Sequence, residues 1–485
     1  MYINEVSLSN FKSFGIKKES FSFSIPNGEV GSGLNLLIGE NNTGKSTLFE
    51  AIDFLRNGTR KQSESIKNRS TGEDAVVEIT FNGKIEQIID GFSQPNKVQV
   101  FKDYMYKIDS GSCLKVSRST LDKKIVKIWD DENKEYQNIT GIDAPFRKLF
   151  ETNFVWADTN PNDETSFGPS TICGNLLKEI SNSFTTTEQY QEFNEKFHQT
   201  FNSEDSSLRQ SLRRIEERTQ QIFDEQFGSA KITFRFNELK IDSFFKNTCI
   251  EIDDGVNTPM EEKGSGMQRS VALALLQVYA EELIKNPQNE ELTKPFFLFI
   301  DEPEICLHPK AQFRLFEALL NLSKSKQIFL ATHSPFFVKT PYLDKMGLFI
   351  FRNEKGTPQP NKIINEKILL PWSPTWGEVI YKAFDLPTVE FHNELYGHLQ
   401  TINGITRIAD FDNWLNGKGF DKDITWTEER AGKPDMQYSV TIQTFIRNKI
   451  HHPENSKMQS VGYSEEQLKD SINQMILLIK QEVNL

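Results

Sequence analysis

Cysteine is scarce in this sequence of 485 residues. The four cysteines, Cys113, Cys173, Cys249 and Cys306, stand far apart, and none belongs to a CxxC pair. Their spacing excludes the usual sequence patterns of a zinc site or a disulfide framework. It favours small buried side chains in a protein of a reducing compartment.

Long apolar runs are also missing. No run approaches the ~20 residues that span a bilayer. The first residues, MYINEVSLSNFKSF, lack the basic start and the unbroken apolar stretch of a signal peptide. We therefore expect a cytoplasmic protein without a membrane partner.

Positive charge is in deficit, because 56 Lys and Arg face 68 Asp and Glu, which gives a formal charge of −12. Proteins that coat nucleic acid indiscriminately need many cations facing the phosphates. The balance argues against that class, while it leaves room for a local basic groove that binds DNA or RNA. The hydrophobic fraction of 37% is ordinary for a folded soluble protein.

The order of expected elements indicates an α/β fold with a second, antiparallel sheet. The strand LNLLIG precedes the helix LFEAIDFLR, and later FFLFID, a helix over Pro309–Ser323 and QIFLATH restore the strand and helix alternation. Between Ala75 and Asp130, the runs VVEITF, KVQVFK, YMYKID, CLKVSR and KKIVKIW predict strands joined as hairpins.

The sequence divides into an expected head and an expected C-terminal domain. Residues 1–355 form the head, and residues 175–226 within it read as polar helix, which suits a short helical arm. A linker carrying Gly and Pro follows Phe351, and residues 363–485 read mostly as helices.

The stretch GENNTGKST satisfies the pattern GxxxxGK[ST] between a strand and a helix. Glycines let successive backbone N–H groups turn toward a phosphate, and the helix N-terminus favours the same anion. Lys45 would reach the β- and γ-phosphates of ATP, Ser46 would ligate Mg²⁺, and Thr47 would support the α-phosphate. The nucleotide-binding residues predicted from this loop are Gly39, Asn42, Gly44, Lys45, Ser46 and Thr47.

Two later strands end in residues that suit hydrolysis. FFLFIDEPE places Asp301 and Glu302 at the end of an apolar strand, where Asp301 would hold Mg²⁺ and Glu302 would orient or deprotonate the attacking water. LATHSP ends another apolar strand at His333, which is placed to sense the γ-phosphate.

A second anion-binding site is predicted in GSGMQRS, residues 264–270, where a Ser and Gly pair stands at the N-terminus of an expected apolar helix. It cannot easily serve the nucleotide that the glycine loop already holds.

Together these motifs resemble the ATP-binding cassette head of the SMC, RecF and OLD (overcoming lysogenization defect) group, over roughly Met1 to Phe351. The resemblance implies that Ser265 and Gly266, with Gln268 beside them, contact ATP held by a second protomer. It implies a homodimer, or a higher oligomer, with two composite ATP sites. Met267 stands where the family often has a second glycine, a departure closer to the OLD branch than to transporter cassettes.

The same resemblance places Glu304, Leu307 and His308 in the D-loop, which usually lies across the dimer seam. Two candidates remain for the Q-loop, namely Gln94 and the segment FVWADTNPND.

In OLD nucleases a metal-binding Toprim domain follows the head. Here DFD supplies Asp410 and Asp412, but the pair sits in a helical pattern, which favours the solvated face of an amphipathic helix over a metal site. Glu394 and His398 are four residues apart on one expected helix face, which favours a surface ion pair over a metal site.

The stretch FIRNKIHHPEN resembles the Rx4–6H motif of HEPN domains, helical bundles that often act as dimeric ribonucleases. Arg447 would hold the scissile phosphate and His452, with His451 beside it, would move the 2′-hydroxyl proton. The alternative is structural, because histidines in a last helical turn before Pro453 suit the helix dipole and end the helix.

The leading hypothesis is an ATPase that dimerises around ATP and controls a toxic effector in bacterial anti-phage defence. The effector would be the chain's own tail or a separate nuclease subunit. Two alternatives stay open: a RecF-like DNA-repair head that binds duplex DNA without cutting it, and a slow scaffold ATPase that sequesters a partner.

Overall fold

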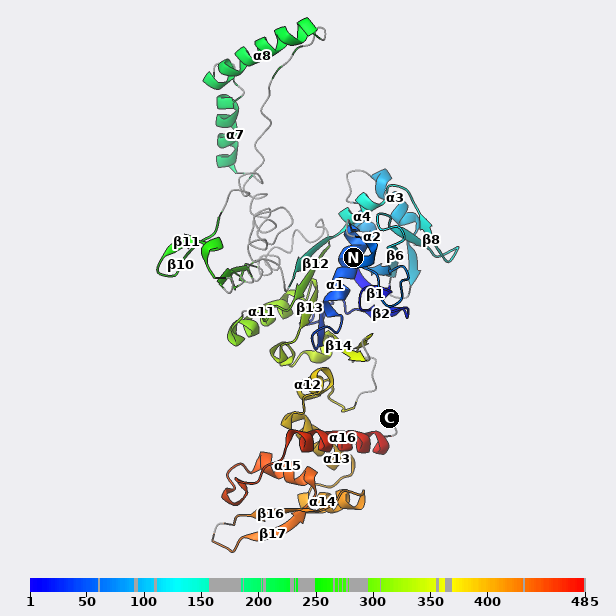
Figure 1. Ribbon diagram of the computed structural model, residues 1–485, viewed down its shortest axis with the longest axis vertical. Helices are drawn as coiled ribbons and strands as arrows, with labels where there is room; N and C mark the ends of the chain where they lie inside the picture. The colour runs from blue at the N-terminus through cyan, green and yellow to red at the C-terminus, as the bar shows by residue number, and fades with distance from the viewer. Residues whose placement is uncertain are drawn as a thin grey trace. The chain divides into compact units, whose positions relative to one another are not determined.

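The computed structural model divides into two compact units, Met1–Ala157 with Leu283–Leu485, and Asp158–Glu282 (Figure 1). The residues that it describes are 1–59, 62–90, 95–108, 111–156, 187–201, 206–226, 249–264, 295–305, 307–354, 357–362, 369–430 and 432–483, with a few isolated positions in the second unit. None of the helices within these residues is both long and apolar enough to cross a membrane.

A six-stranded sheet organises the first unit, in the order β15-β14-β3-β13-β12-β9. The five strands from β14 to β9 run parallel, and β15 pairs antiparallel at the edge. The strands are β3 (Leu34–Gly39), β9 (Glu151–Val155), β12 (Phe296–Asp301), β13 (Gln327–Thr332), β14 (Gly347–Glu354) and β15 (Thr357–Lys362). Strands β3 and β13 are buried at every position, as expected for parallel strands covered on both faces.

A second, seven-stranded sheet is antiparallel and runs β2-β1-β4-β6-β7-β8, with β5 beside β6. Its strands are β1 (Tyr2–Ser9), β2 (Glu19–Ser22), β4 (Val76–Asn82), β5 (Tyr106–Ile108), β6 (Gly111–Ser119), β7 (Lys127–Asp130) and β8 (Glu135–Asn138). The α/β head with an antiparallel sheet is therefore confirmed.

One predicted strand in that region is wrong. KVQVFK lies in the helix α3 (Pro95–Asp103), next to α2 (Ile85–Asp90) and α4 (Asp143–Leu149). Pro95 lacks the N–H that a sheet ladder needs but fits the first turn of a helix, and Phe101 is buried from that helix. The alternation of valines in KVQVFK therefore predicted a strand where the chain forms a helix.

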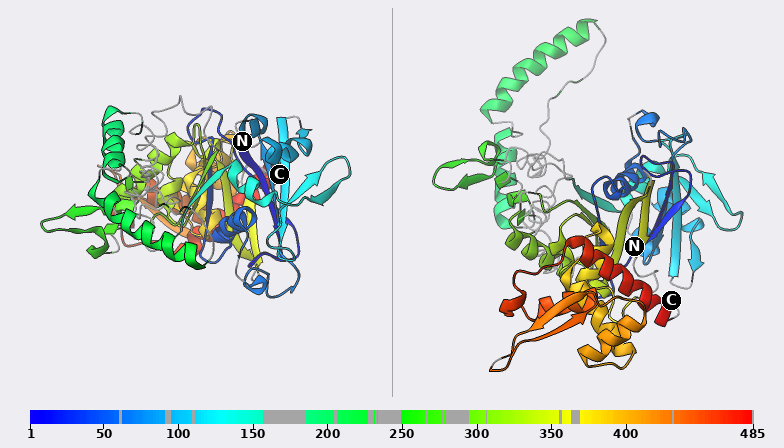
Figure 2. Two further views of the ribbon diagram at one scale, coloured as in Figure 1. Left: turned by 90° about the horizontal axis from the view of Figure 1, so that it is seen from above. Right: turned by 60° about the horizontal axis from the view of Figure 1, so that its bottom comes forward.

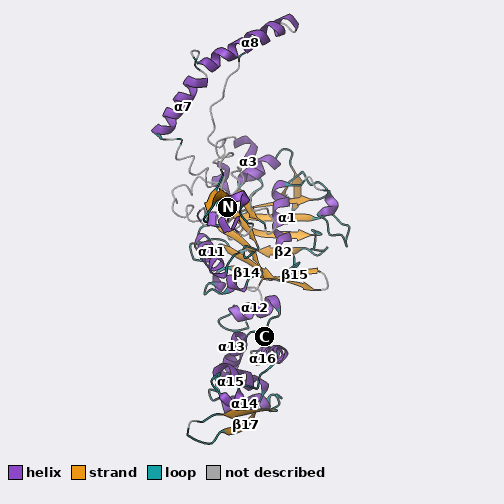
Figure 3. Ribbon diagram, turned by 60° about the vertical axis from the view of Figure 1, so that its left-hand side comes forward, coloured by secondary structure: helices purple, strands orange, loops and turns teal. Residues whose placement is uncertain are grey.

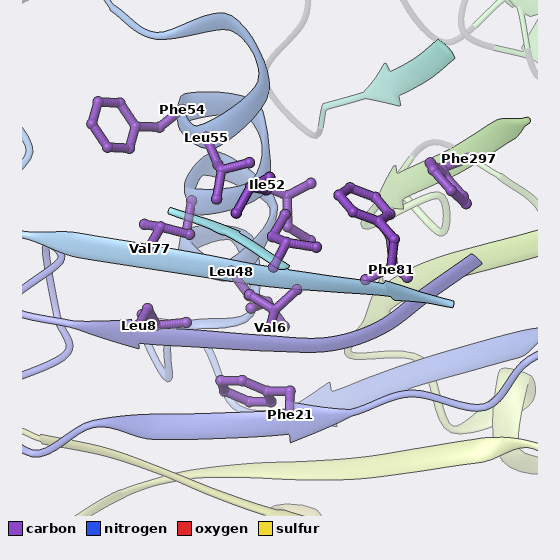
Figure 4. Close-up of a cluster of buried hydrophobic side chains, with 14 of the residues drawn as sticks. Val6, Leu8, Phe21, Leu48, Ile52, Phe54, Leu55, Val77, Phe81 and Phe297 are labelled. Atoms are coloured by element: carbon purple, nitrogen blue, oxygen red, sulfur yellow. The ribbon is translucent and has the colours of Figure 1, made fainter. Parts of the chain in front are cut away.

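Helix α1 (Lys45–Asn57) contacts strands of both sheets. Its apolar side chains Leu48, Ile52 and Leu55 join Val6, Val77 and Phe297 in one continuous core (Figure 4). Burying each such side chain contributes about 1.5–3 kcal/mol. The core therefore fixes the helix that starts immediately after the glycine loop. Helix α11 (Pro309–Leu322), predicted from the sequence, begins at the cap His308 and also packs in the first unit.

The second unit contains the helices α7 (Glu188–Phe201) and α8 (Ser207–Gln226), followed by the hairpin of β10 (Glu251–Asp253) and β11 (Asn257–Pro259). Figure 3 draws α7 and α8 as successive helices, in agreement with the polar helical pattern of their sequence. An ion pair between Arg209 and Glu216, 2.8 Å apart, lies along α8. The predicted strand KITFRF falls almost wholly outside the described residues.

The C-terminal region has a hydrophobic core of its own, which includes Leu395, Phe411, Trp426 and Ile479. Its helices are α12 (Trp376–Phe384), α13 (Val389–Ile402), α14 (Ile408–Gly417), α15 (Ile442–His451) and α16 (Glu465–Glu482). The mostly helical expectation omitted one hairpin, formed by β16 (Ile424–Glu428) and β17 (Met436–Val440), which Figure 2 shows in orange.

Helix α12 joins this region to the parallel sheet. It contacts β3, β14 and the short helix η4 (Pro335–Val338). The indole N–H of Trp376 donates to the carbonyl oxygen of Pro335 at 3.1 Å, and the Lys339 ammonium lies 5.7 Å from the centre of the Trp376 rings. The first turn of the C-terminal region thus touches the chain immediately after His333.

Candidate functional site

The glycine loop connects β3 to α1, as the sequence predicts. Gly44 adopts a φ of 97° and Asn42 a φ of 61°, so the loop passes through the left-handed region twice. A Cβ added to Gly39 would lie 2.1 Å from the carbonyl oxygen of Phe351 in the neighbouring strand β14. Glycine is required at that position by the sheet as well as by the loop.

Lys45 begins α1 and is only 4% exposed. Its ammonium donates to the carbonyl oxygens of Gly39 at 2.9 Å and Glu40 at 2.7 Å. Burial lowers the pKa of Lys45 to about 8, although the carboxylates of Glu302 and Asp301 act in the opposite direction. A buried cation held by weak carbonyl partners is suited to exchange them for phosphate oxygens.

Asp301 ends β12 and is buried beside the glycine loop. Burial raises its pKa to about 6, against a hydrogen bond from Ser46 and the charge of Lys45, and with the nearby charge of Glu302 adding to the rise. Its Oδ1 atom has no hydrogen-bond partner within the described part of the chain. A hard divalent cation prefers such oxygen ligands, so Asp301 and Ser46 fit the Mg²⁺ that the sequence implies.

Glu302, the residue after Asp301, has an unusual backbone conformation. Its φ of 49° lies in the left-handed region, which costs a non-glycine residue about 1–3 kcal/mol. Its N–H donates to the carbonyl oxygen of Ala331 at 2.9 Å, which continues the pairing of β12 with β13 for one more residue. The turn directs the Glu302 carboxylate to His333, where Oε1 lies 2.7 Å from Nε2.

His333 follows β13 and bridges two of the other motifs. Its Nδ1 lies 2.7 Å from the carbonyl oxygen of Gly39. A carbonyl only accepts hydrogen bonds, so Nδ1 carries a hydrogen and the 3.5 Å approach of the Lys45 ammonium to Nδ1 joins two donors. Nε2 and the Glu302 carboxylate are then joined by a hydrogen bond that links these two side chains.

Glu304, predicted to lie in the D-loop, contacts the end of β13 within its own chain, while its place in a dimer seam stays a prediction. Its Oε1 accepts hydrogen bonds from the Thr332 hydroxyl at 2.8 Å and the His333 N–H at 2.5 Å. Its Oε2 is buried without a partner among the residues that the structure describes. No local sequence pattern indicates the contact of Glu304 with His333, because these residues are 29 positions apart.

The second predicted anion-binding site, residues 264–270, belongs to the unit Asp158–Glu282. Ser265 and Gly266 lie outside the described residues. Gln268 is described, and its side-chain amide donates to the carbonyl oxygens of Glu261 at 3.1 Å and Lys263 at 2.8 Å. Of the two Q-loop candidates, Gln94 lies outside the described residues and FVWADTNPND is described only through Trp156.

Arg447 and the two histidines of the HEPN-like motif lie at the end of α15. The positive charges of Arg447 and His452 act, after burial, to lower the pKa of His451, so the three side chains are near one another. Arg447 donates to Asn448 at 3.1 Å, and the exposed His452 lies 3.3 Å from the Glu454 carboxylate. His452 also ends the helix, since its N–H bonds the Asn448 carbonyl.

The remaining acidic candidates have structural partners. Asp412 is buried, accepts from the Thr441 N–H at 3.0 Å and hydroxyl at 2.8 Å, and pairs with Lys422 at 2.8 Å. It therefore fixes Thr441, the N-cap residue of α15; DFD lies in the helix α14 as predicted, but Asp412 is buried and does not belong to a solvated face.

The predicted ion pair between Glu394 and His398 is wrong. Glu394 accepts from the Thr375 hydroxyl at 2.6 Å, and the His398 ring packs edge-on against Trp372. Both side chains are held by the packing between α12 and α13.

A family model described as an AAA ATPase domain matches residues 1–338 of this chain. The chain belongs to this AAA ATPase domain family. Every residue of the site at β3, β12 and β13 lies within the AAA ATPase domain. The ATPase resemblance drawn from the sequence is thereby confirmed, whereas the HEPN-like segment lies beyond residue 338 and stays a prediction.

Among curated proteins, the chain is similar to the Old nuclease of Escherichia phage P2, with 26% identity over 388 residues and 75% of this chain covered. It is also 29% identical over 137 residues to an uncharacterized protein of Methanocaldococcus jannaschii, with 27% of this chain covered. The chain spans 61% of the phage protein's length and 32% of the archaeal protein's.

Solved structures of SMC heads are also similar to the chain. An SMC head bound to the C-winged helix domain of ScpA shares 16% identity, with a TM-score of 0.44, over 75% of this chain and 98% of the head. An SMC head with an extended coiled coil, bound to the C-terminal domain of ScpA derived from Pyrococcus furiosus, shares 17% identity with a TM-score of 0.41, over 75% and 96% of the two chains.

Proposed function

We propose that this AAA ATPase domain binds ATP with Mg²⁺ and hydrolyses its γ-phosphate. One observation carries the proposal. The parallel neighbours β3, β13 and β12 place Lys45, His333, Glu302 and Asp301 together at one edge of the sheet. Ligand sites in α/β sheets form at the carboxyl ends of the strands.

Each side chain has a role that follows from its chemistry. Lys45 and the N-terminus of α1 bind the β- and γ-phosphates. Ser46 and Asp301 hold Mg²⁺, which neutralises charge on the phosphate oxygens. Glu302 accepts a proton from the attacking water, and His333 fixes the Glu302 carboxylate through the hydrogen bond at its Nε2.

The test measures ATP binding and phosphate release for the same set of variants. Glu302→Gln keeps the size of the side chain but removes the base, so ATP binding should persist while turnover falls about 100-fold or more. Lys45→Ala should lose binding itself. Glu317→Gln on the exposed side of α11 is the matched control and should behave as wild type. Normal turnover by the Glu302 variant would overturn the assignment of the base.

We further propose that two copies enclose two ATP molecules, with Ser265, Gly266 and Gln268 of one copy completing the site of the other. The support is the sequence motif at residues 264–270, whose Ser and Gly pair precedes an apolar run of helical pattern. A mixture of Lys45→Ala and Ser265→Ala chains should recover part of the activity that each lacks, because a mixed dimer retains one intact composite site. Full activity of a monomeric wild-type chain would contradict this proposal.

We propose that ATP closure controls an effector, as part of anti-phage defence. Two observations support this role. The phage relative is named a nuclease. The hydrogen bond of Trp376 to Pro335 also links the segment after His333 to the C-terminal region. The role is tested by infecting bacteria that express either the wild type or Glu302→Gln with phage and by comparing phage growth. Equal phage growth with and without the wild-type chain and its gene neighbours would refute it.

The C-terminal region itself is a second candidate, as a ribonuclease. The clustering of Arg447, His451 and His452 at an accessible helix end favours it. Arg447→Ala and His452→Ala should abolish RNA cleavage or toxicity while ATP turnover persists, and Arg407→Ala, an exposed arginine of the same region, is the control. Unchanged cleavage in both variants would dismiss the tail as effector and leave a separate nuclease subunit.

A further inference from the structure

Glu304 has no role in the hydrolysis scheme above, yet its side chain turns into the same site. It follows β12 by three residues, whereas its two hydrogen-bond donors, the Thr332 hydroxyl and the His333 N–H, stand at the end of β13. The Glu304 carboxylate therefore connects the loop after β12 to the end of β13 by hydrogen bonds.

This contact sets the position of the His333 ring. Strand β13 ends at Thr332, so the His333 N–H lies beyond the sheet ladder, and Glu304 is its hydrogen-bond acceptor. The ring attached to that backbone must reach the Gly39 carbonyl with one nitrogen and the Glu302 carboxylate with the other, at 2.7 Å in both cases. A displacement of the backbone would break one of these two bonds.

Keeping Glu304 at this place is costly. Its Oε2 is buried without a partner among the described residues, and an unsatisfied buried acceptor lowers stability. Its charge also adds to those of Glu302 and Asp301 near Lys45. A third carboxylate is unfavourable for stability alone, so its presence is better explained by what it positions.

We propose that Glu304 is a positioning residue that holds the His333 ring between the Gly39 carbonyl and the Glu302 carboxylate, so that the hydrogen bond between His333 and Glu302 is formed when the nucleotide arrives. The proposal rests on the ATP hydrolysis proposed above. It predicts that Glu304 acts through His333 and has no independent effect on the reaction.

A double-mutant cycle tests this dependence. Glu304→Ala should lower kcat at least tenfold and change the KM for ATP less than threefold, and Glu304→Gln should lie between it and wild type because its amide oxygen still accepts. Combining Glu304→Ala with His333→Ala should be no slower than His333→Ala alone. Independent, multiplying effects or wild-type turnover by Glu304→Ala would overturn the proposal. Glu317→Gln is the matched control.

A second readout does not depend on turnover. In the full chain labelled with ¹⁵N-histidine, the His333 ring signals are identified by their loss in His333→Ala. Glu304→Ala should shift these signals, and unchanged signals would refute the positioning role. If the wild type releases no phosphate, the hydrolysis proposal fails, while the ring signals still decide the role of Glu304. Should Glu304→Ala fail to fold, Glu304→Gln and Thr332→Val provide the same comparison.

Discussion

Replacing Asp301 by Asn should stabilise the nucleotide-free protein while it weakens Mg²⁺-dependent nucleotide binding. Asp301 is 4% exposed, and burial raises its pKa from the ordinary 3.8 to about 6. At about 1.4 kcal/mol for each pKa unit, keeping the carboxylate charged costs the folded state roughly 3 kcal/mol at pH 7. Asn resembles the neutral acid in size and avoids this cost.

The pH dependence provides an internal check. Between about pH 4 and pH 6 the folded state binds more protons than the unfolded state, so the stability of the wild type falls as the pH rises through this window. Above pH 6 the full cost is present, and near pH 4 it has vanished. The advantage of Asp301→Asn should therefore be largest at pH 7 to 8 and close to zero near pH 4.

Thermal unfolding without nucleotide measures the effect. A gain of ~3 kcal/mol corresponds to a rise in Tm of roughly 5 °C or more for a domain of this size. Asp344→Asn, an exposed carboxylate in the same domain, is the control and should leave Tm nearly unchanged. A lower Tm for Asp301→Asn, or a difference that does not vary with pH, would refute the electrostatic reasoning.

Three further predictions follow from the loop, the cation and the junction. Gly39→Ala should destabilise the fold by about 1–3 kcal/mol in urea unfolding, because its Cβ would collide with the Phe351 carbonyl; unchanged stability would contradict the packing. ATP affinity should fall as the pH rises above about 8, where Lys45 loses its proton, and calorimetry at pH 8.5 should detect proton uptake on binding, whereas an affinity independent of pH would refute this. Trp376→Phe should leave ATP affinity unchanged but reduce the ATP-induced change in hydrogen exchange of the C-terminal region, since it removes the bond to Pro335; an undiminished change would show that this contact transmits nothing.

The glycine loop and the three strand ends could be predicted because their signals are local. A buried strand, a GxxxxGK[ST] loop and a helix follow one another, and parallel strands bring their carboxyl ends to one edge. Neither the coupling of His333 to Glu302 nor the inward turn of Glu304 could be predicted, because both depend on how β12 and β13 align.

The errors have the same origin. The hairpin of β16 and β17 pairs Ile424 with Val440 across a turn, whereas the sequence predicts mostly helices over residues 363–485. At α3, Pro95 outweighed an apparent alternation of valines. In each case, partners distant in sequence or a single backbone constraint decided the structure.

Strands β3, β13 and β12 are immediate neighbours, bonded to one another through buried backbone ladders. These ladders hold the strand ends together as one platform, and Glu304 extends that hold to His333, one residue beyond β13, so the paired acids and the histidine stay near one another. Turnover cannot then be switched by separating these groups. Regulation has to act on what reaches the platform, whether nucleotide, metal or the helix tip of another copy.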